Sequence, residues 1–77
     1  MTPEQFDQVL RAFVRRRPFR PFLIELISGD RLRVAHPEAI ELRGEMWVVV
    51  AGPGRQYRVF VASAVCQLLD PPEPAGA

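Results

Sequence analysis

The stretch FLIELISGDRLRVA, residues 22–35, carries the signals of two paired β-strands and of the turn between them. Side chains in residues 22–28 and in residues 31–35 alternate between two faces, which is typical of strands that are buried on one side. Gly29 and Asp30 lie between the two runs and are residues that tight hairpin turns favour. We therefore expect an antiparallel hairpin whose core-facing side chains are Phe22, Ile24, Leu26, Leu32 and Val34.

Toward the C-terminus the chain continues as short strands separated by turn signals. Pro37 has no N–H to give to a strand ladder, so His36-Pro37-Glu38 should interrupt the pairing. Beyond this bend we expect residues 39–52 to form two short strands, or one bent pair, around Gly44-Glu45. Further strands are expected in residues 55–62 and 66–70, with a turn at 52–54 and one helical turn at 63–65.

Toward the N-terminus, residues 1–17 (MTPEQFDQVLRAFVRRR) predict a helix. Thr2 is suited to cap it, Pro3 suits its first position, and Gln5 completes a capping box with Thr2. Apolar residues recur at helical spacing and would form one stripe that docks on the strands, namely Phe6, Val9, Leu10, Phe13 and Val14.

The segment RRRPFRPF, residues 15–22, joins the helix to the hairpin. We expect its first three arginines in the last helical turn, where cations interact favourably with the helix dipole, and the first proline to end the helix. The two prolines should hold the rest extended with a three-residue period, which places Phe19 and Phe22 on one face and Arg17 and Arg20 on another. The structural interpretation is a rigid crossover with aromatic anchors, and the functional alternative is an arginine ridge presented to an anionic partner.

Together these elements predict an α+β, mainly β fold. An N-terminal helix would precede a small, strongly bent, five-stranded antiparallel barrel of the Sm-like or SH3-like kind. Residues 1–70 would form this single domain, and residues 71–77 (PPEPAGA), which are rich in proline and poor in apolar side chains, would form a disordered tail.

The order of these elements resembles that of the Sm-like fold of LSm proteins and bacterial host-factor RNA chaperones. The resemblance rests on the helix, the basic linker, the strand and turn at SGDRL (28–32), and FVASAVCQLLD (60–70) as strand, single turn and last strand. The residues also resemble a group of small uncharacterised bacterial proteins that open with Met-Thr and carry RPFRPF, a Gly-Asp turn and HPE. This second resemblance covers residues 2–69 and implies no activity.

The Sm-like resemblance implies ring assembly through strand edges and RNA binding at loops that face a pore. Its Asp/Asn pair is not matched by AHPEAIELR (35–43), and its basic residue and glycine before the last strand are not matched by VFVASAVCQ (59–67). Ala35 stands where the second strand usually has a glycine. The resemblance therefore predicts the barrel without its RNA pocket.

The composition predicts a homo-oligomer. At 77 residues a single core is barely sufficient, and the lone Cys66 excludes an intrachain disulfide. The apolar fraction of 48% and the run Val48-Val49-Val50 call for cover on both faces of a strand. Since no signal peptide is visible and no apolar stretch approaches the roughly 20 residues of a membrane span, we expect a soluble cytoplasmic protein without a membrane partner.

No group of residues matches a catalytic, cofactor-binding or metal-binding motif, so we expect neither an enzyme nor a cofactor. His36 is interpreted as a turn residue, and Cys66 as a small buried hydrophobe. Trp47 and Tyr57 could stack on nucleic-acid bases, but core or interface positions fit them better.

Two functions remain open. The first is an assembly or protein-interaction module that forms a homo-oligomer through strand edges and contacts another protein. The alternative is an RNA or DNA binder that uses the arginines of residues 11–20 on phosphates. The net charge of only +1 weighs against strong nonspecific binding. The candidate binding residues are Arg11, Arg15, Arg16, Arg17 and Arg20.

Overall fold

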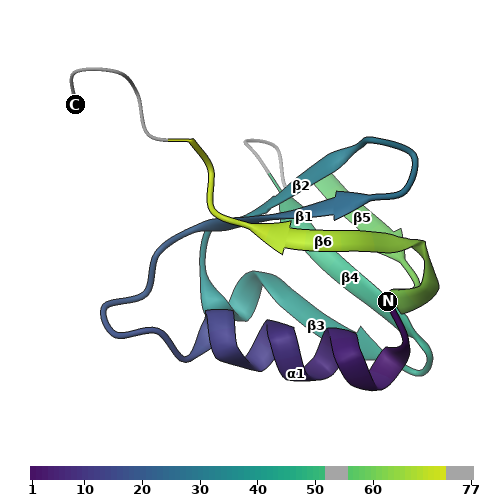
Figure 1. The fold of residues 1–77 in the computed structure, drawn as a ribbon, viewed down its shortest axis with the longest axis horizontal. Coiled ribbons are helices and arrows are strands. Elements are labelled where there is room, and N and C mark those ends of the chain that lie inside the picture. The colour runs from purple at the N-terminus through teal and green to yellow at the C-terminus, as the bar shows by residue number, and fades with distance from the viewer. Residues whose placement is uncertain (52–55, 73–77) are drawn as a thin grey trace.

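The structure is a computed structural model that describes residues 1–51 and 56–72. The turn expected at residues 52–54 and most of the expected tail lie outside these residues. Along the chain the elements are α1 (Pro3–Val14), β1 (Phe22–Leu26), β2 (Arg31–Val34), the 3-10 turn η1 (Pro37–Ala39), β3 (Ile40–Arg43), β4 (Met46–Ala51), β5 (Gln56–Phe60), the 3-10 turn η2 (Ala62–Ala64) and β6 (Val65–Leu69) (Figure 1).

The six strands form two antiparallel sheets of three strands each, in the orders β2-β1-β6 and β3-β4-β5. The α+β class is confirmed, but the five-stranded barrel is wrong. No ladder joins the two sheets within residues 1–51 and 56–72, and the chain passes between them at η1, after β2, and at η2, after β5. Pro37 opens η1 and has no N–H, so the chain leaves one sheet there before it enters the other.

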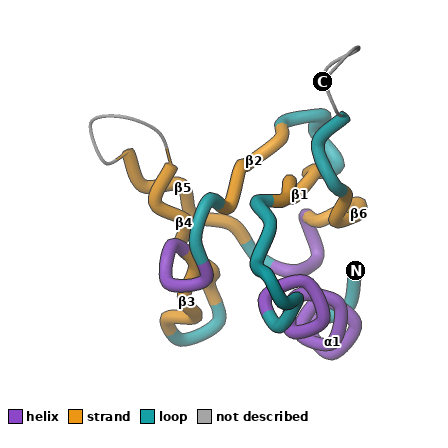
Figure 2. The backbone as a smooth tube through the Cα atoms, turned by 90° about the vertical axis from the view of Figure 1, so that its left-hand side faces the viewer, coloured by secondary structure: helices purple, strands orange, loops and turns teal. Residues whose placement is uncertain are grey.

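The core lies between the two sheets and α1, which runs along the lower side of the molecule (Figures 1 and 2). The Phe6 ring meets Trp47 of β4 at 5.1 Å and Phe60 of β5 at 5.6 Å, in edge-to-face geometry. The Met1 nitrogen donates to the Val65 carbonyl at 2.8 Å, which ties the start of the chain to β6. The buried apolar residues are Phe6, Leu10, Phe22, Ile24, Leu32, Val34, Ile40, Val49, Phe60, Ala62, Val65 and Leu68.

The predicted helix start is confirmed and its predicted end is wrong. The Gln5 N–H donates to Thr2 Oγ1 and the Thr2 N–H donates to Gln5 Oε1, both at 3.1 Å, which completes the capping box. The helix ends at Val14, with Arg15 as its C-cap, so the arginines of residues 15–17 follow the last turn instead of occupying it.

The crossover has the predicted division between its two residue types. Phe22 is fully buried and Phe19 partly buried, with 6.2 Å between their ring centroids, whereas Arg17 and Arg20 are exposed. The chain bends at Arg17 and Pro18 instead of following the regular three-residue spiral. The rings anchor the segment to the core, and the arginines project from it.

Two predicted turns are confirmed by their glycines. Gly29 has φ 97° between β1 and β2, and Gly44 has φ 62° between β3 and β4. Backbone with positive φ strains residues that carry a Cβ, so glycine suits both positions. No helix among the residues described here combines the length and apolarity needed to cross a membrane.

Cys66 is exposed, so its predicted burial is wrong. The register between β1 and β6 passes from Glu25↔Gln67 to Leu26↔Val65, which leaves Cys66 as the extra residue of a β-bulge. Val65 on one side of the bulge is buried, and the extra residue turns the Cys66 side chain outward.

Candidate protein-interaction surfaces

The five arginines predicted as binding residues do not form one free surface. Arg11 Nε donates to Asp7 Oδ2 at 2.9 Å within α1. Arg16 Nη1 donates to Asp70 Oδ1 at 2.7 Å, and Arg16 Nη2 donates to the Arg20 carbonyl at 3.0 Å. The Arg16 guanidinium also lies 4.7 Å from the centroid of the Phe13 ring. Arg16 therefore holds the fold together and is not available to a partner.

The other three candidates, Arg15, Arg17 and Arg20, have exposed side chains. Within the described part of the chain none of them forms an ion pair. They follow the end of α1 and lie in the crossover, which protrudes at the left end of the molecule in Figure 1. Of the five arginines predicted to bind a partner, three therefore remain as exposed cations without an ion pair to another described residue, and they follow one another in the loop after α1.

A second surface, which we call the outer face, belongs to the sheet β3-β4-β5. Trp47 and Val49 of β4 point toward the core, so Met46, Val48 and Val50, which alternate with them, point away from it. The register pairs Val48 with Val59 and Val50 with Tyr57 on this far side. The outer face therefore comprises Met46, Val48 and Val50 of β4 and Tyr57 and Val59 of β5.

The outer face is apolar and open. Tyr57 is 66% exposed, Val59 53% and Met46 48%. On β3, Glu41 and Arg43 border this face and pair with each other at 2.7 Å. Nothing among the described residues covers it, and β5 is a sheet edge there, so both a face and an edge are available to a partner.

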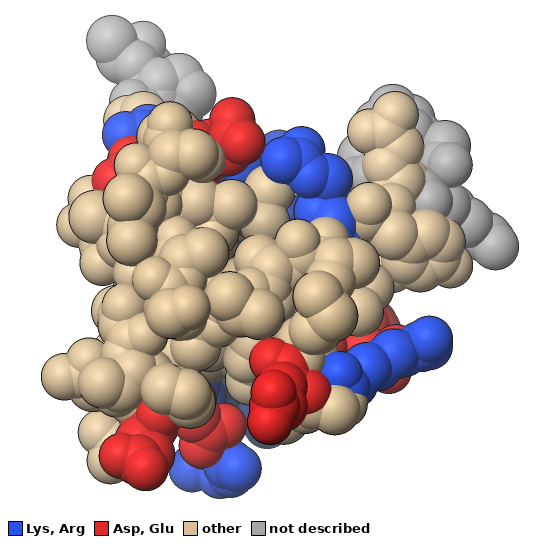
Figure 3. Space-filling model, turned by 90° about the vertical axis from the view of Figure 1, so that its right-hand side faces the viewer, with Lys and Arg blue, Asp and Glu red and all other residues tan. Residues whose placement is uncertain are grey.

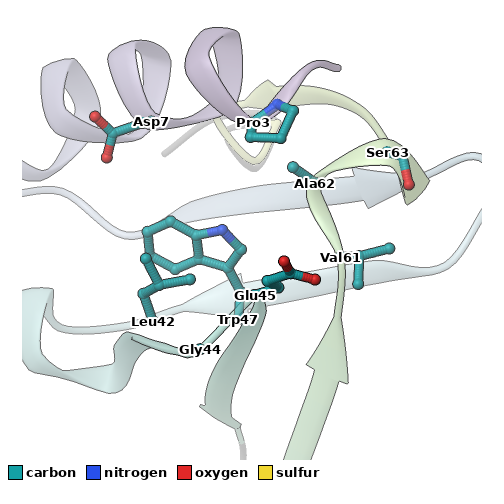
Figure 4. A pocket seen from close by; sticks show the side chains of 9 residues that line it. All are labelled: Pro3, Asp7, Leu42, Gly44, Glu45, Trp47, Val61, Ala62 and Ser63. Carbon is teal, nitrogen blue, oxygen red and sulfur yellow. The ribbon is translucent and has the colours of Figure 1, made fainter.

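The third surface is a groove between α1 and the β3–β4 turn, with a volume of about 650 Å³. Figure 4 shows the indole of Trp47 and the side chain of Leu42 beneath α1, with Ala62 and Ser63 of η2 closing one side. Its lining residues are Pro3, Asp7, Leu42, Gly44, Glu45, Trp47, Val61, Ala62 and Ser63. A smaller depression of about 330 Å³ also touches Asp7 and Trp47 and has Arg11 and Arg15 in its lining.

Charges lie at the margin of this end of the molecule. Figure 3 looks at the right-hand end of Figure 1 and shows a broad area without charged side chains, with both acidic and basic side chains along its lower and upper parts. In the groove the two acidic residues are Asp7 and Glu45. Glu45 is exposed and forms no ion pair with the other described residues.

The remaining candidates do not assemble into a reactive site. His36 is exposed at the start of η1, and Ser63 is exposed at the rim of the groove. In residues 1–51 and 56–72 no three His, Cys, Asp or Glu side chains are placed to hold a metal ion. Trp47 packs against the core, as its core interpretation predicts, and Tyr57 lies on the outer face.

Sequence reasoning predicted neither the outer face nor the groove as a location. The run Val48-Val49-Val50 carried a signal for the outer face, because it placed apolar side chains on both sides of one strand. The groove had no signal, since its residues come from α1, β3, the β3–β4 turn, β4 and the chain at η2, which are separate in sequence. Comparisons with models of protein families, with curated proteins and with solved structures gave no match.

Proposed function

We propose that this chain is a non-enzymatic assembly module that associates with copies of itself through the outer face of β4 and β5. The observation that carries the proposal is the set of exposed apolar side chains on that face, above all Tyr57, Val59 and Met46. Contiguous apolar patches on soluble proteins mark interaction sites, because water is released when they are covered.

A second copy suits this face because the face is complementary to itself. Its centre is apolar, and its border on β3 carries one acid, Glu41, and one base, Arg43. In a two-fold dimer each residue meets its counterpart reciprocally, so Glu41 of one copy can lie near Arg43 of the other. β5 is also an open edge of its sheet, so its unpaired backbone N–H and C=O groups can form hydrogen bonds with those of the second copy.

The proposal places the protein in the cytoplasm. Cys66 is exposed, and the chain has no second cysteine to pair with it. A thiol in this position suits a reducing compartment, because oxidising compartments convert exposed cysteines to disulfides.

The test compares charged substitutions on and off the outer face. Val59→Glu should raise the dissociation constant of the assembly by at least tenfold, because it places a carboxylate in the middle of the buried patch. Ile27→Glu is the matched control, since Ile27 is 72% exposed and lies outside the outer face. Sedimentation equilibrium measures both constants. Equal constants for the two variants would exclude the outer face as the contact.

Nucleic-acid binding is the alternative function, and the exposed Arg15, Arg17 and Arg20 favour it. Three phosphate contacts would give a slope of roughly −3 for the logarithm of the binding constant against the logarithm of the salt concentration. Gel-shift titrations of short RNA and DNA at several salt concentrations measure this slope. Absence of a shift at low salt would remove the alternative.

A further inference from the structure

The groove beneath α1 has the charge and shape to receive a cation. Asp7 and Glu45 place carboxylates in its lining, and none of its nine lining residues is basic. Asp7 already shares its charge with Arg11, whereas Glu45 has no ion partner among the described residues. A cation that enters the groove would therefore meet one unpaired carboxylate and one that is paired only at the surface.

The floor of the groove favours a planar, delocalised cation. Trp47 is partly buried and presents its ring beneath α1, beside Leu42 (Figure 4). Tryptophan is the aromatic side chain that attracts cations most strongly, and a guanidinium group can stack on it while it donates hydrogen bonds to carboxylates. Arginine therefore fits this groove better than lysine.

The protein itself presents exposed arginines at the end of the molecule opposite the groove. Arg17 and Arg20 project from the crossover, which lies at the left end of the molecule in Figure 1, while the β3–β4 turn lies toward the right. The crossover and the β3–β4 turn thus lie at opposite ends of the molecule, and no crossover residue lines the groove of its own copy. Phe19 and Phe22 anchor the crossover to the core, which holds the two arginines out in a fixed loop.

We propose that the groove of one copy binds the Arg17–Arg20 loop of a second copy. This contact uses different surfaces on the two partners, so it joins copies head to tail and leaves a free loop and a free groove at the ends. The proposal shares with the proposed function the premise that copies associate, but it uses neither Tyr57 nor Val59. Head-to-tail contact extends pairs that form through the outer face into larger assemblies.

The experiment uses chains that carry Val59→Glu, so that contact through the outer face is weakened. In this background, the groove variant Glu45→Arg should weaken self-association by at least tenfold because it opposes like charges, and the loop variant Arg17→Gln with Arg20→Gln should do so because it removes the cations. The neutral loop also cannot pair with the arginine of the groove variant. In an equimolar mixture the groove variant supplies an intact loop and the loop variant supplies an intact groove. One copy of each variant can therefore bind the other through a single contact. Sedimentation velocity should then show a heterodimer that does not grow with concentration.

A matched control and a gentler variant keep the test sharp. Glu38→Arg makes the same charge change at an exposed position on η1, outside both the groove and the outer face, and should leave head-to-tail association unchanged. Glu45→Gln removes the charge without reversing it and should weaken association less than Glu45→Arg. Circular dichroism checks that each variant is folded. Failure of the mixture to form a heterodimer, or equal effects of Glu38→Arg and Glu45→Arg, would overturn the proposal.

The single tryptophan gives a direct readout of the groove. Trp47 fluorescence of the loop variant should change when a groove variant that also carries Trp47→Phe is added, because only the first chain then emits strongly at the tryptophan wavelength. The change should weaken as salt is added, since the contact is ionic. An unchanged Trp47 spectrum at saturating concentration would also overturn the proposal. This readout does not depend on the outer-face contact, because both chains already carry Val59→Glu. Failure of the outer-face contact and failure of the groove contact are therefore distinguishable.

Discussion

Arg16 joins the end of α1, the crossover and the segment that follows β6. It follows α1, its Nη1 reaches Asp70 beyond the end of β6, and its Nη2 reaches the Arg20 carbonyl in the crossover. The guanidinium covers the face of Phe13, which shields these contacts from water on one side. Its side chain is only 20% exposed, in contrast to that of its neighbour Arg17.

Alanine substitutions should separate these two arginines. Arg16→Ala should lower the free energy of unfolding by about 1–2 kcal/mol, because it removes two charge-assisted hydrogen bonds and a ring contact. Arg17→Ala should change it by less than about 0.5 kcal/mol, as exposed side chains without partners do. Urea unfolding measures both values. A loss for Arg17→Ala as large as that for Arg16→Ala would contradict this division of roles.

The two phenylalanines of the crossover should differ in the same way. Phe22→Ala should cost about 3–5 kcal/mol, because Phe22 is fully buried and its removal leaves a cavity between α1 and the sheets. Phe19→Ala should cost about 1–2 kcal/mol, since Phe19 is only partly buried. Thermal or urea unfolding checks the order. A larger loss at Phe19 would show that the crossover is anchored differently.

At the residue scale the sequence predicted the division between phenylalanines and arginines, since three-residue spacing separates them onto different sides. It could not predict the role of Arg16, because its partner Asp70 is 54 positions away. It also placed Cys66 in the core, since the bulge depends on how β6 pairs with β1 and leaves no local signal.

At the element scale the strands and turns were predictable because their signals are local. Alternation over four to six residues, the glycines at 29 and 44, and Pro37 between β2 and β3 suffice to place them. Closure of the barrel was not predictable, since it depends on whether strands from distant parts of the chain share a ladder. Two sheets of three strands leave four open edges among the described residues, where a closed barrel would leave none.

Glu25 connects the three strands of the first sheet and gives it a pH dependence. Its carboxylate accepts hydrogen bonds from Gln67 of β6 and Arg31 of β2, both at 2.9 Å. The hydrogen bond from Gln67, followed by that from Arg31, holds the pKa of Glu25 below its ordinary value. Because the folded state favours the ionised form, this contribution to stability is present above the pKa of the unfolded chain and is lost as pH falls through the lowered pKa.

Glu25→Gln should therefore lower the melting temperature at neutral pH. The difference from the unmodified chain should shrink as the pH falls below the ordinary pKa of a glutamate, because the unmodified carboxyl then also becomes neutral. Calorimetry over a pH series measures this convergence. A difference that stays constant down to the most acidic pH would show that the charge of Glu25 does not contribute.

At the scale of the whole molecule, apolar side chains exceed what one small core encloses. The sequence predicted self-association from the apolar fraction of 48% and from the Val48-Val49-Val50 run. The position of the contact needed the structure, because only the pairing of β4 with β5 brings Tyr57 and Val59 beside Val48 and Val50. The groove likewise forms only when α1 crosses over the β3–β4 turn.

Copies of this chain should associate in solution, and the molar mass of the unmodified protein shows whether they do. Light scattering coupled to size-exclusion chromatography gives this mass without an assumption about shape. At micromolar concentrations we expect a mass of at least twice the 8.7 kDa of one chain, rising as the concentration rises. A mass of 8.7 kDa at every concentration would contradict it.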